Sequence, residues 1–290
     1  MTLSQLAAPS TLGLPDQVTD AELARYAELI YARTGIRVSP QKKALLSNRL
    51  RRRLRSTGID DFEAYYRWLK TLPPQDPEWD AFLQEITTHE TYLFRDPPQW
   101  DWLRNVYLPR WAAFAQTGGG SVSLRIWSAA CSTGDEAFTA ACCVAACTAN
   151  TSRHHVQILG TDIGTGAVEQ ARTAVFNQRA MGMVPDNYRK CYFTKARNAE
   201  VWQAKPVLAR MVAFRRHNLL EPLSERPFDV VFLKNVLIYF DRDSKKRVMA
   251  NILPMLRPGG MLVAGAAEGV TDLVRGLVRV DSWLYQRPTA

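Results

Sequence analysis

Apolar residues recur at helical spacing along the first part of the chain. Leu46, Leu50 and Leu54 repeat every fourth residue after Ser39-Pro40, so they share one face of a helix whose other positions are largely cationic. Further helices are expected to begin at Thr19-Asp20-Ala21-Glu22, which has the form of a capping box, at Asp60-Asp61-Phe62-Glu63 and near Trp79. The pattern therefore predicts an all-helical N-terminal domain over residues 19–90, preceded by an aperiodic, flexible tail over residues 1–18.

The pattern changes after Gly118-Gly119-Gly120, a flexible break beyond which strand-like and helix-like stretches alternate. Apolar runs typical of strands cover residues 124–127, 156–160, 212–215, 228–233 and 261–264, and a closing pair covers residues 277–280 and 283–285. Helical stretches lie between them, at residues 136–147, 165–175 and 243–256. Such alternation predicts an α/β fold, in which a parallel sheet is covered by helices on both faces. Residues 177–211 interrupt the alternation and are expected to form an inserted subdomain.

The composition is that of an ordinary globular protein. Of the 290 residues, 47% are apolar and 22% are charged. No apolar run is long enough to span a bilayer and the N-terminus lacks a cationic start, so we expect a cytoplasmic protein without membrane insertion. The five cysteines form no C-x-x-C pair and the four histidines add no zinc-like spacing, so no metal is predicted.

The net charge of +9 predicts an acidic partner. Seven cations stand close together in one stretch that contains no acidic residue: Lys42, Lys43, Arg49, Arg51, Arg52, Arg53 and Arg55. This stretch is either a solvated helix face or a docking surface for an acidic partner. No aromatic residues are interleaved with these cations, so nucleic acid is not the expected partner.

Candidate chemistry begins directly after the first predicted strand. Small residues from Ser128 to Gly134 would let backbone amides approach a ligand closely at the start of a helix. The two acids that follow, Asp135 and Glu136, would repel a pyrophosphate. They suit a ligand with a cationic amine, such as the amino-acid end of S-adenosylmethionine. The alternative is plain helix capping, because acids are favoured in the first turn of any helix.

A second candidate is Asp162, at the end of the second predicted strand. An acid at this position can accept hydrogen bonds from both ribose hydroxyls of a nucleoside cofactor. The pairing of a small-residue turn with this acid predicts a nucleoside-binding sheet but does not separate NAD from S-adenosylmethionine. The acids at Asp135 and Glu136 favour the latter.

Six segments resemble, in order, the motifs of the CheR-type chemotaxis receptor (protein-glutamate) O-methyltransferase family. They are residues 86–95 (ITTHETYLFR), 126–134 (IWSAACSTG), 159–163 (LGTDI), 217–220 (HNLL), 228–241 (FDVVFLKNVLIYFD) and 256–260 (LRPGG). The resemblance covers nearly the whole chain. It implies that the helical domain is followed by a Rossmann-like S-adenosylmethionine methyltransferase domain over residues 91–290, in which residues 177–211 form a small β-subdomain insert.

The resemblance also implies a reaction and a partner. The enzyme would transfer a methyl group from S-adenosylmethionine to glutamate carboxylates of methyl-accepting chemotaxis receptors, leaving glutamate methyl esters and S-adenosylhomocysteine. The cationic stretch from Lys42 to Arg55 would bind the acidic cytoplasmic helical bundle of the receptor, and we expect a monomer. Arg95 and Tyr239 would lie nearest the methyl group and the incoming carboxylate, as catalytic residues. The cofactor contacts implied by the family motifs are His89, Thr91, Arg95, Glu136, Asp162, Asn218, Leu219, Asn235 and Val236.

The chain departs from the family's usual residues at several positions. His89 replaces an asparagine and Lys234 an arginine, while Ala137 and Phe138 stand where proline and tyrosine are usual, and Ala266-Ala267 where histidine and serine are. These replacements leave two alternatives open. One is a catalytically weakened signalling module that binds S-adenosylmethionine or S-adenosylhomocysteine, and the other is a methyltransferase for another acidic target.

Overall fold

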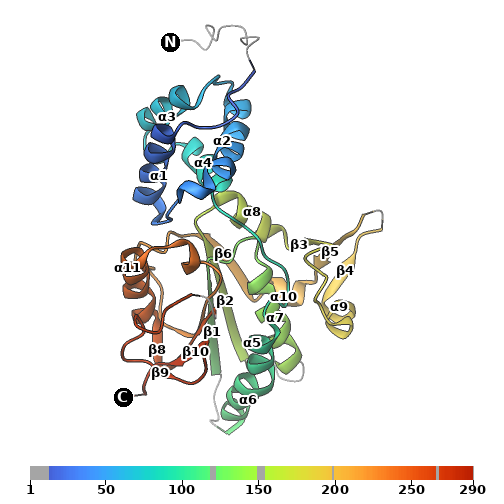
Figure 1. Ribbon diagram of the computed structural model, residues 1–290. Coiled ribbons are helices and arrows are strands. Elements are labelled where there is room, and N and C mark those ends of the chain that lie inside the picture. Colours follow the sequence, from blue (N-terminus) through green and yellow to red (C-terminus); the bar gives the residue numbers. More distant parts are fainter. Residues whose placement is uncertain (1–12, 118–121, 149–153, 198, 266–267, 290) are drawn as a thin grey trace. The chain divides into compact units, whose positions relative to one another are not determined.

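The computed structural model describes residues 13–117, 122–148, 154–197, 199–265 and 268–289 (Figure 1). The expected break at Gly118-Gly119-Gly120, most of the expected N-terminal tail and the Ala266-Ala267 pair lie outside the described residues. The chain divides into two compact units, one up to Thr88 and the other from His89 onward. We call them the helical domain and the α/β domain.

The helical domain contains the four helices that the periodicity predicted. They are α1 (Asp20–Thr34), α2 (Lys43–Thr57), α3 (Phe62–Thr71) and α4 (Pro77–Ile86). The capping box of α1 is confirmed, because Thr19 Oγ1 accepts the Glu22 amide hydrogen at 3.2 Å and Glu22 Oε2 accepts the Thr19 amide hydrogen at 2.6 Å. Ser39-Pro40 begins a 3₁₀ turn, η1 (Pro40–Lys42), from which α2 continues. The predicted apolar face of α2 is buried: Leu46, Leu50 and Leu54.

The α/β domain is built on a seven-stranded sheet with the order β6-β2-β1-β7-β8-β10-β9. Its parallel strands include the five predicted runs: β1 (Val122–Ala129), β2 (His154–Asp162), β6 (Val212–Arg216), β7 (Phe228–Leu233) and β8 (Leu256–Ala264). The closing pair, β9 (Val278–Arg279) and β10 (Leu284–Gln286), is antiparallel. The strand order runs outward from β1 on one side and from β7 on the other, so the direction of winding reverses between them.

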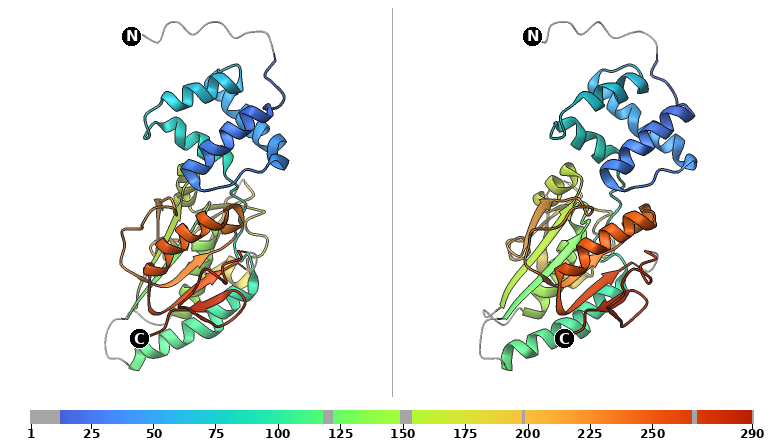
Figure 2. Two further views of the ribbon diagram at one scale, coloured as in Figure 1. Left: turned by 60° about the vertical axis from the view of Figure 1, so that its left-hand side comes forward. Right: turned by 90° about the vertical axis from the view of Figure 1, so that its left-hand side faces the viewer.

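Helices cover both faces of this sheet, as expected. Successive β7 side chains alternate between two cores, with Val230 and Phe232 in one and Val231 and Leu233 in the other. The second core includes α11 (Arg242–Ile252), which runs along its face of the sheet (Figure 2). The helical segments that contribute to the first include α5 (Pro97–Trp102), η2 (Leu103–Tyr107), α6 (Leu108–Thr117) and α7 (Asp135–Thr148). The remaining helix beside the sheet, α8 (Thr165–Thr173), follows β2.

A second, three-stranded sheet with the order β3-β5-β4 occupies most of the expected insert (Figure 1). Its strands are β3 (Val175–Asn177), β4 (Phe193–Lys195) and β5 (Val201–Ala204), accompanied by α9 (Asp186–Tyr192) and α10 (Pro206–Ala209). Its aromatic side chains join the first core, since Phe176 packs against Phe138 on α7.

The helices of the α/β domain differ from the prediction in two places. The helix predicted over residues 243–256 ends at Ile252, because Pro254 lacks an amide hydrogen and the chain tightens into the 3₁₀ turn η4 (Leu253–Met255). The helical run from α5 to α6 was not predicted, because its tryptophans give no clear apolar period. Within the described ranges, no helix has the length and apolar character needed to cross a membrane.

Candidate active site

The register of the main sheet brings three loops to one edge. Ala129, the last residue of β1, pairs with Thr161 on β2 and with Leu233 on β7. Asp162, which ends β2, and Lys234, which follows β7, therefore lie at the same carboxyl edge as the loop after β1. This edge includes the reversal of the winding direction, where open α/β sheets bind ligands.

The loop after β1 has a constrained backbone. Ala130 (φ 66°), Ser132 (φ 51°) and Gly134 (φ 91°) all have positive φ. For alanine and serine such angles cost on the order of 1 kcal/mol each. A Cβ atom at Gly134 would come within 2.9 Å of the Cβ of Ala171, so a side chain there would not fit against α8. Of the small residues noted in the sequence, Gly134 is thus required by the shape of the loop.

The Asp162 carboxylate is oriented by backbone amides. Its Oδ2 accepts a hydrogen bond from the Ser132 amide at 2.8 Å, and its Oδ1 accepts one from the Gly164 amide at 2.9 Å. Nδ1 of His89 lies 4.0 Å from Oδ1. A carboxylate offers about four acceptor positions, so positions remain for the hydroxyl groups of a ligand. The geometry suits the ribose-binding role suggested by the sequence.

Glu136 lies in the first turn of α7, beside a buried lysine. Ser128 Oγ donates to Glu136 Oε1 at 2.7 Å, and Nζ of Lys234 lies 3.6 Å from Oε2. Burial raises the pKa of Glu136, and the positive charge of Lys234 opposes that rise. The Lys234 side chain is only 2% exposed, so salt screens this pair weakly.

Lys234 also holds the segment of residues 89–96 that precedes α5, which we call the linker. Its Nζ donates to the Arg95 carbonyl oxygen at 3.3 Å, lies 3.3 Å from Asp96 Oδ2 and stands 5.0 Å from the centre of the Trp100 ring. The indole N–H of Trp100 donates to the same carbonyl oxygen at 2.6 Å. One buried ammonium thus connects α7, the loop after β7 and the linker. The sequence marked Lys234 only as a departure from the family, and its connecting role was missed.

The two residues expected to be catalytic lie on different segments. The half-buried guanidinium of Arg95 donates to the Glu90 carbonyl oxygen at 2.8 Å and lies 5.8 Å from the centre of the Tyr92 ring. A guanidinium carries five N–H donors, so most remain for a substrate carboxylate. Tyr239 is partly buried and ends the 3₁₀ turn η3 (Leu237–Tyr239), which follows β7. Their catalytic role stays a prediction.

A buried carboxylate to which the sequence assigned no role supports the loop after β7. Asn235 has a φ of 57°, and the Val236 amide donates to Glu268 Oε1 at 3.1 Å. Glu268 is 0% exposed, and burial raises its pKa, while hydrogen bonds from the amides of residues 235–238 oppose the rise. A Cβ atom at Gly265 would lie 2.9 Å from Oε1. Glu268 therefore holds the segment that carries Asn235, Val236 and Tyr239; a lone acid after the apolar strand was its only sequence signal.

The other expected cofactor residues lie on adjoining segments. The His217 amide donates to the Asp162 carbonyl oxygen at 2.8 Å, which places Asn218 beside the end of β2. The Leu219 side chain is buried in the core with α11. Its carbonyl oxygen accepts a hydrogen bond from Asn251 Nδ2 at 3.0 Å. Thr91 is partly buried and belongs to the same linker as His89 and Arg95.

Two departures from the family pattern belong to the core. Ala137 and Phe138 are buried on α7, where Phe138 meets the Phe176 ring edge to face with 5.3 Å between ring centres. The next residue, Thr139, accepts the Phe94 amide hydrogen at 2.9 Å and thereby ties the linker to α7. In this chain both positions therefore serve packing within the core.

The cationic stretch of the helical domain is partly engaged within that domain. Arg53 makes two hydrogen bonds to Glu78, at 3.0 and 2.6 Å, and its side chain is only 15% exposed. Arg52 pairs with Glu85 at 2.6 Å but remains exposed. Other members that bond within the domain are Lys43, Arg49 and Arg51, and those that are exposed include Lys42 and Arg55.

The arrangement fits a nucleoside cofactor that carries positive charge. Glu136 and Asp162 place carboxylates at two loops of one edge, where they would repel a pyrophosphate and attract a sulfonium or ammonium group. The remaining acceptor positions of Asp162 suit a ribose. Within the described part of the chain, no group of His, Cys, Asp and Glu residues is arranged to hold a metal ion.

Comparisons with known proteins identify the family and agree with S-adenosylmethionine as the cofactor. The family model "CheR methyltransferase, all-alpha domain" matches residues 21–87, and "CheR methyltransferase, SAM binding domain" matches residues 89–281. The chemotaxis protein methyltransferases of Salmonella typhimurium and Escherichia coli are each 32% identical to this chain over 262 residues, which cover 89% of this chain and 87% of theirs. That of Borreliella burgdorferi is 30% identical over 257 residues, covering 87% of this chain and 89% of the relative.

Proposed function

The chain belongs to the CheR methyltransferase family and is an S-adenosylmethionine-dependent methyltransferase, and we propose that it methylates glutamate side chains of chemotaxis receptors. The observation that carries the proposal is the pair of oriented carboxylates, Glu136 and Asp162, at the edge where the winding of the sheet reverses. The acidic substrate is suggested by the names of the relatives and by the positive charge of the chain.

We assign the two ends of the cofactor to these two acids. Asp162 would accept hydrogen bonds from the ribose hydroxyls, and Glu136 would face the ammonium group of the amino-acid end. S-adenosylmethionine supplies a methyl group on a sulfonium, which is an activated leaving group. The further contacts that we propose are His89, Thr91, Asn218, Leu219, Asn235 and Val236.

The acceptor needs no general base. A free glutamate side chain has a pKa of about 4.3, so it is already a carboxylate nucleophile at neutral pH. The site must therefore position the carboxylate in line with the methyl group, which alone can supply several kcal/mol of the barrier reduction. This requirement agrees with a site that is built from anchored loops rather than from an acid–base pair.

Arg95 and Tyr239 are proposed to position the acceptor. The Arg95 backbone is fixed by Lys234 and Trp100, whereas its guanidinium donates to the Glu90 carbonyl oxygen, an acceptor that a substrate carboxylate could replace. A moderate grip is preferable, because binding the ground state as tightly as the transition state would not raise turnover.

The exposed cations of η1 and α2 are proposed to engage the acidic helices of the receptor. Lys42, Arg52 and Arg55 are exposed enough to do so, while Arg53 is committed to Glu78. Electrostatic attraction of this kind mainly accelerates association and weakens as salt is added.

Labelled methyl transfer tests the proposal directly. The chain is incubated with labelled S-adenosylmethionine and receptor-rich membranes, and the label is scored as base-labile ester on the receptor. Ester formation that requires the receptor supports the proposal. Cofactor binding by calorimetry without ester formation would indicate a signalling module instead, and transfer to a different acidic protein would reassign the substrate.

A further inference from the structure

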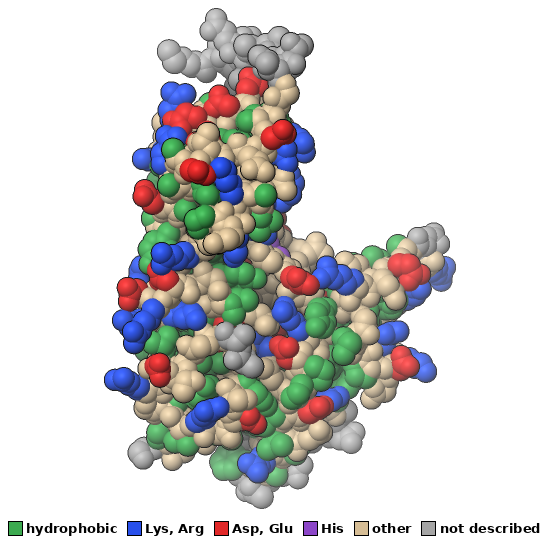
Figure 3. All heavy atoms as spheres, viewed as in Figure 1, with side chains coloured by type: hydrophobic (Ala, Val, Ile, Leu, Met, Phe, Trp, Pro, Cys, Tyr) green, Lys and Arg blue, Asp and Glu red, His purple; other side chains and the backbone are tan. Residues whose placement is uncertain are grey.

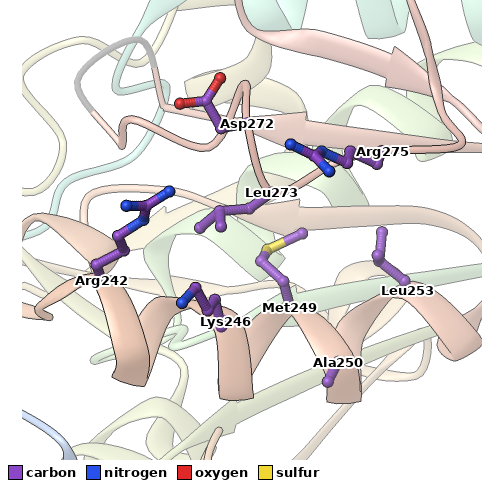
Figure 4. Close-up of a pocket in the computed structure, with 8 residues that line it drawn as sticks. All are labelled: Arg242, Lys246, Met249, Ala250, Leu253, Asp272, Leu273 and Arg275. Carbon is purple, nitrogen blue, oxygen red and sulfur yellow. The ribbon is translucent and has the colours of Figure 1, made fainter.

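A cleft of about 470 Å³ lies between α11 and the segment around residues 272–275, and neither Glu136 nor Asp162 is among the residues that line it (Figure 4). Its apolar side is formed by Met249, Leu253 and Leu273. Its cationic rim is formed by Arg242 and Lys246 on α11 and by Arg275 on the opposite wall. The volume lies in the range of clefts that accept one or two side chains or a small ligand.

The rim carries unbalanced positive charge. Asp272 is the one acid among the lining residues, against three cations. Lys246 pairs with Asp243 at 3.1 Å, and both side chains are more than half exposed. In the described part of the chain, neither Arg242 nor Arg275 forms an ion pair, and both are exposed. Figure 3 shows Lys and Arg side chains gathered on the left edge of the α/β domain, where Figure 1 places α11.

The apolar side continues into the core of the domain. Met249 is 2% exposed and belongs to the core beneath α11, and Leu253 and Leu273 pack against that same core. Methionine is flexible and polarizable, so it adapts to side chains of different shape. An apolar base with a cationic rim suits an amphipathic acidic segment. No aromatic side chain that could stack on the base of a single-stranded nucleic acid is among the residues that line the cleft.

Both walls of the cleft begin at the active-site loops. Asp241 follows the turn that ends at Tyr239, and it caps α11 by accepting the Ser244 amide hydrogen at 2.9 Å. The opposite wall follows Glu268, the carboxylate that holds Val236. Lys245 on α11 joins the two walls by donating to the Glu268 carbonyl oxygen at 2.7 Å. A segment docked in the cleft would therefore lie on the continuation of the elements that shape the site.

We infer that this cleft docks an acidic amphipathic helix of the substrate receptor, next to the glutamate that is methylated. An apolar side chain of that helix packs against Leu253 and Leu273, and its carboxylates face Arg242 and Arg275. This inference rests on the proposed receptor substrate. It assigns part of receptor recognition to the α/β domain, in addition to the cations of η1 and α2.

The test is a double charge reversal, Arg242→Glu with Arg275→Glu, in the full chain. The KM for the receptor should rise about five- to tenfold, and the salt dependence of kcat/KM should flatten, because reversed rim charges slow association. The turnover number at saturating receptor and the calorimetric affinity for S-adenosylmethionine should not change. A matched control, Arg226→Glu with Arg247→Glu, makes the same change of charge at exposed positions outside the cleft and should leave KM nearly unaltered.

An unchanged KM in the cleft variant would overturn the inference, as would an equal effect in the control. If the cleft variant lost as much affinity for S-adenosylmethionine as for the receptor, the inference would also be overturned, since the cleft would then be part of the cofactor site. Direct binding of a soluble receptor cytoplasmic fragment, followed by fluorescence anisotropy, separates this inference from the proposed function. Cleft-dependent binding without any methyl transfer would support docking and refute the proposed reaction. If the charge reversal weakened binding of RNA but not binding of the receptor fragment, the docking inference would be refuted and the proposed function would stand.

Discussion

Nζ of Lys234 lies 3.6 Å from Oε2 of Glu136, and the lysine side chain is almost completely buried. This contact joins the loop after β7 to the first turn of α7, the two segments that are expected to meet the cofactor. Because the same ammonium donates to the Arg95 carbonyl oxygen, the linker depends on it as well. The position of the proposed catalytic arginine is therefore coupled to the position of a cofactor-binding acid.

Replacing Lys234 with methionine should destabilise the fold. The Glu136 carboxylate would lose its buried partner, which costs about 3 kcal/mol in free energy of unfolding. Lys234→Arg keeps the charge and serves as the control. Urea denaturation followed by circular dichroism measures both, and an unchanged midpoint for Lys234→Met would show that the pair is not important for stability.

Asp162→Asn should weaken cofactor binding with little effect on the fold. One amide hydrogen now bound by the carboxylate would face an NH₂ group, and the proposed ribose hydrogen bonds would weaken, so affinity should fall roughly tenfold to a hundredfold. Calorimetry with S-adenosylhomocysteine measures this change. Asp186→Asn, at an exposed position outside the site, should leave the affinity unaltered; wild-type affinity in Asp162→Asn would remove Asp162 from the site.

Arg95→Ala should lower turnover about a hundredfold, because the acceptor carboxylate would lose its positioning cation. The main chain at this position is held by Trp100 and Lys234, so the thermal unfolding temperature should change little. Arg95→Lys should recover part of the activity, since it restores the charge without the forked geometry. Full ester formation by Arg95→Ala would refute the assignment.

Glu268→Gln should change how stability depends on pH. Burial raises the pKa of Glu268 above its ordinary value of 4.5, so the folded protein holds this proton more tightly than the unfolded chain does. The resulting stabilisation is complete below pH 4.5 and is lost as the pH rises through the higher, folded-state pKa. The glutamine variant does not titrate, so between pH 4.5 and neutrality its unfolding free energy should decline less than that of the wild type. Parallel urea-unfolding curves across that range would contradict this expectation.

Replacing Arg53 should lower the stability of the fold, whereas replacing Arg55 should not. Arg53→Ala leaves Glu78, whose side chain is only 10% exposed, without its cation, and should cost about 3 kcal/mol of stability. Arg55→Ala should leave stability unchanged, because this side chain is exposed. In methyl-transfer assays Arg55→Glu should raise the KM for the receptor while cofactor affinity stays constant. A similar loss of stability in both alanine variants would refute the distinction.

The strands could be predicted because burial on both faces produces largely apolar runs, as in β7, which extends over Phe228–Leu233 as expected and contains one charged residue, Asp229. Helix limits were less secure. Helix α11 ends at Ile252, earlier than predicted, because a proline lies inside the predicted range. The helical run from α5 to α6 was not predicted, because tryptophans such as Trp100 do not form a clear helical period.

The amino-acid sequence by itself determined that a turn with two acids follows the first strand and that Asp162 stands at the end of the second. Since the carboxyl ends of parallel strands meet at one edge, these residues could be expected to share a site before any coordinates were known. Only the tertiary structure decided that Lys234 would lie beside Glu136, that Glu268 would hold the Val236 amide, and that Arg53 would pair with Glu78. Each of these contacts joins segments far apart in the chain, and local sequence patterns contain no information about such pairs.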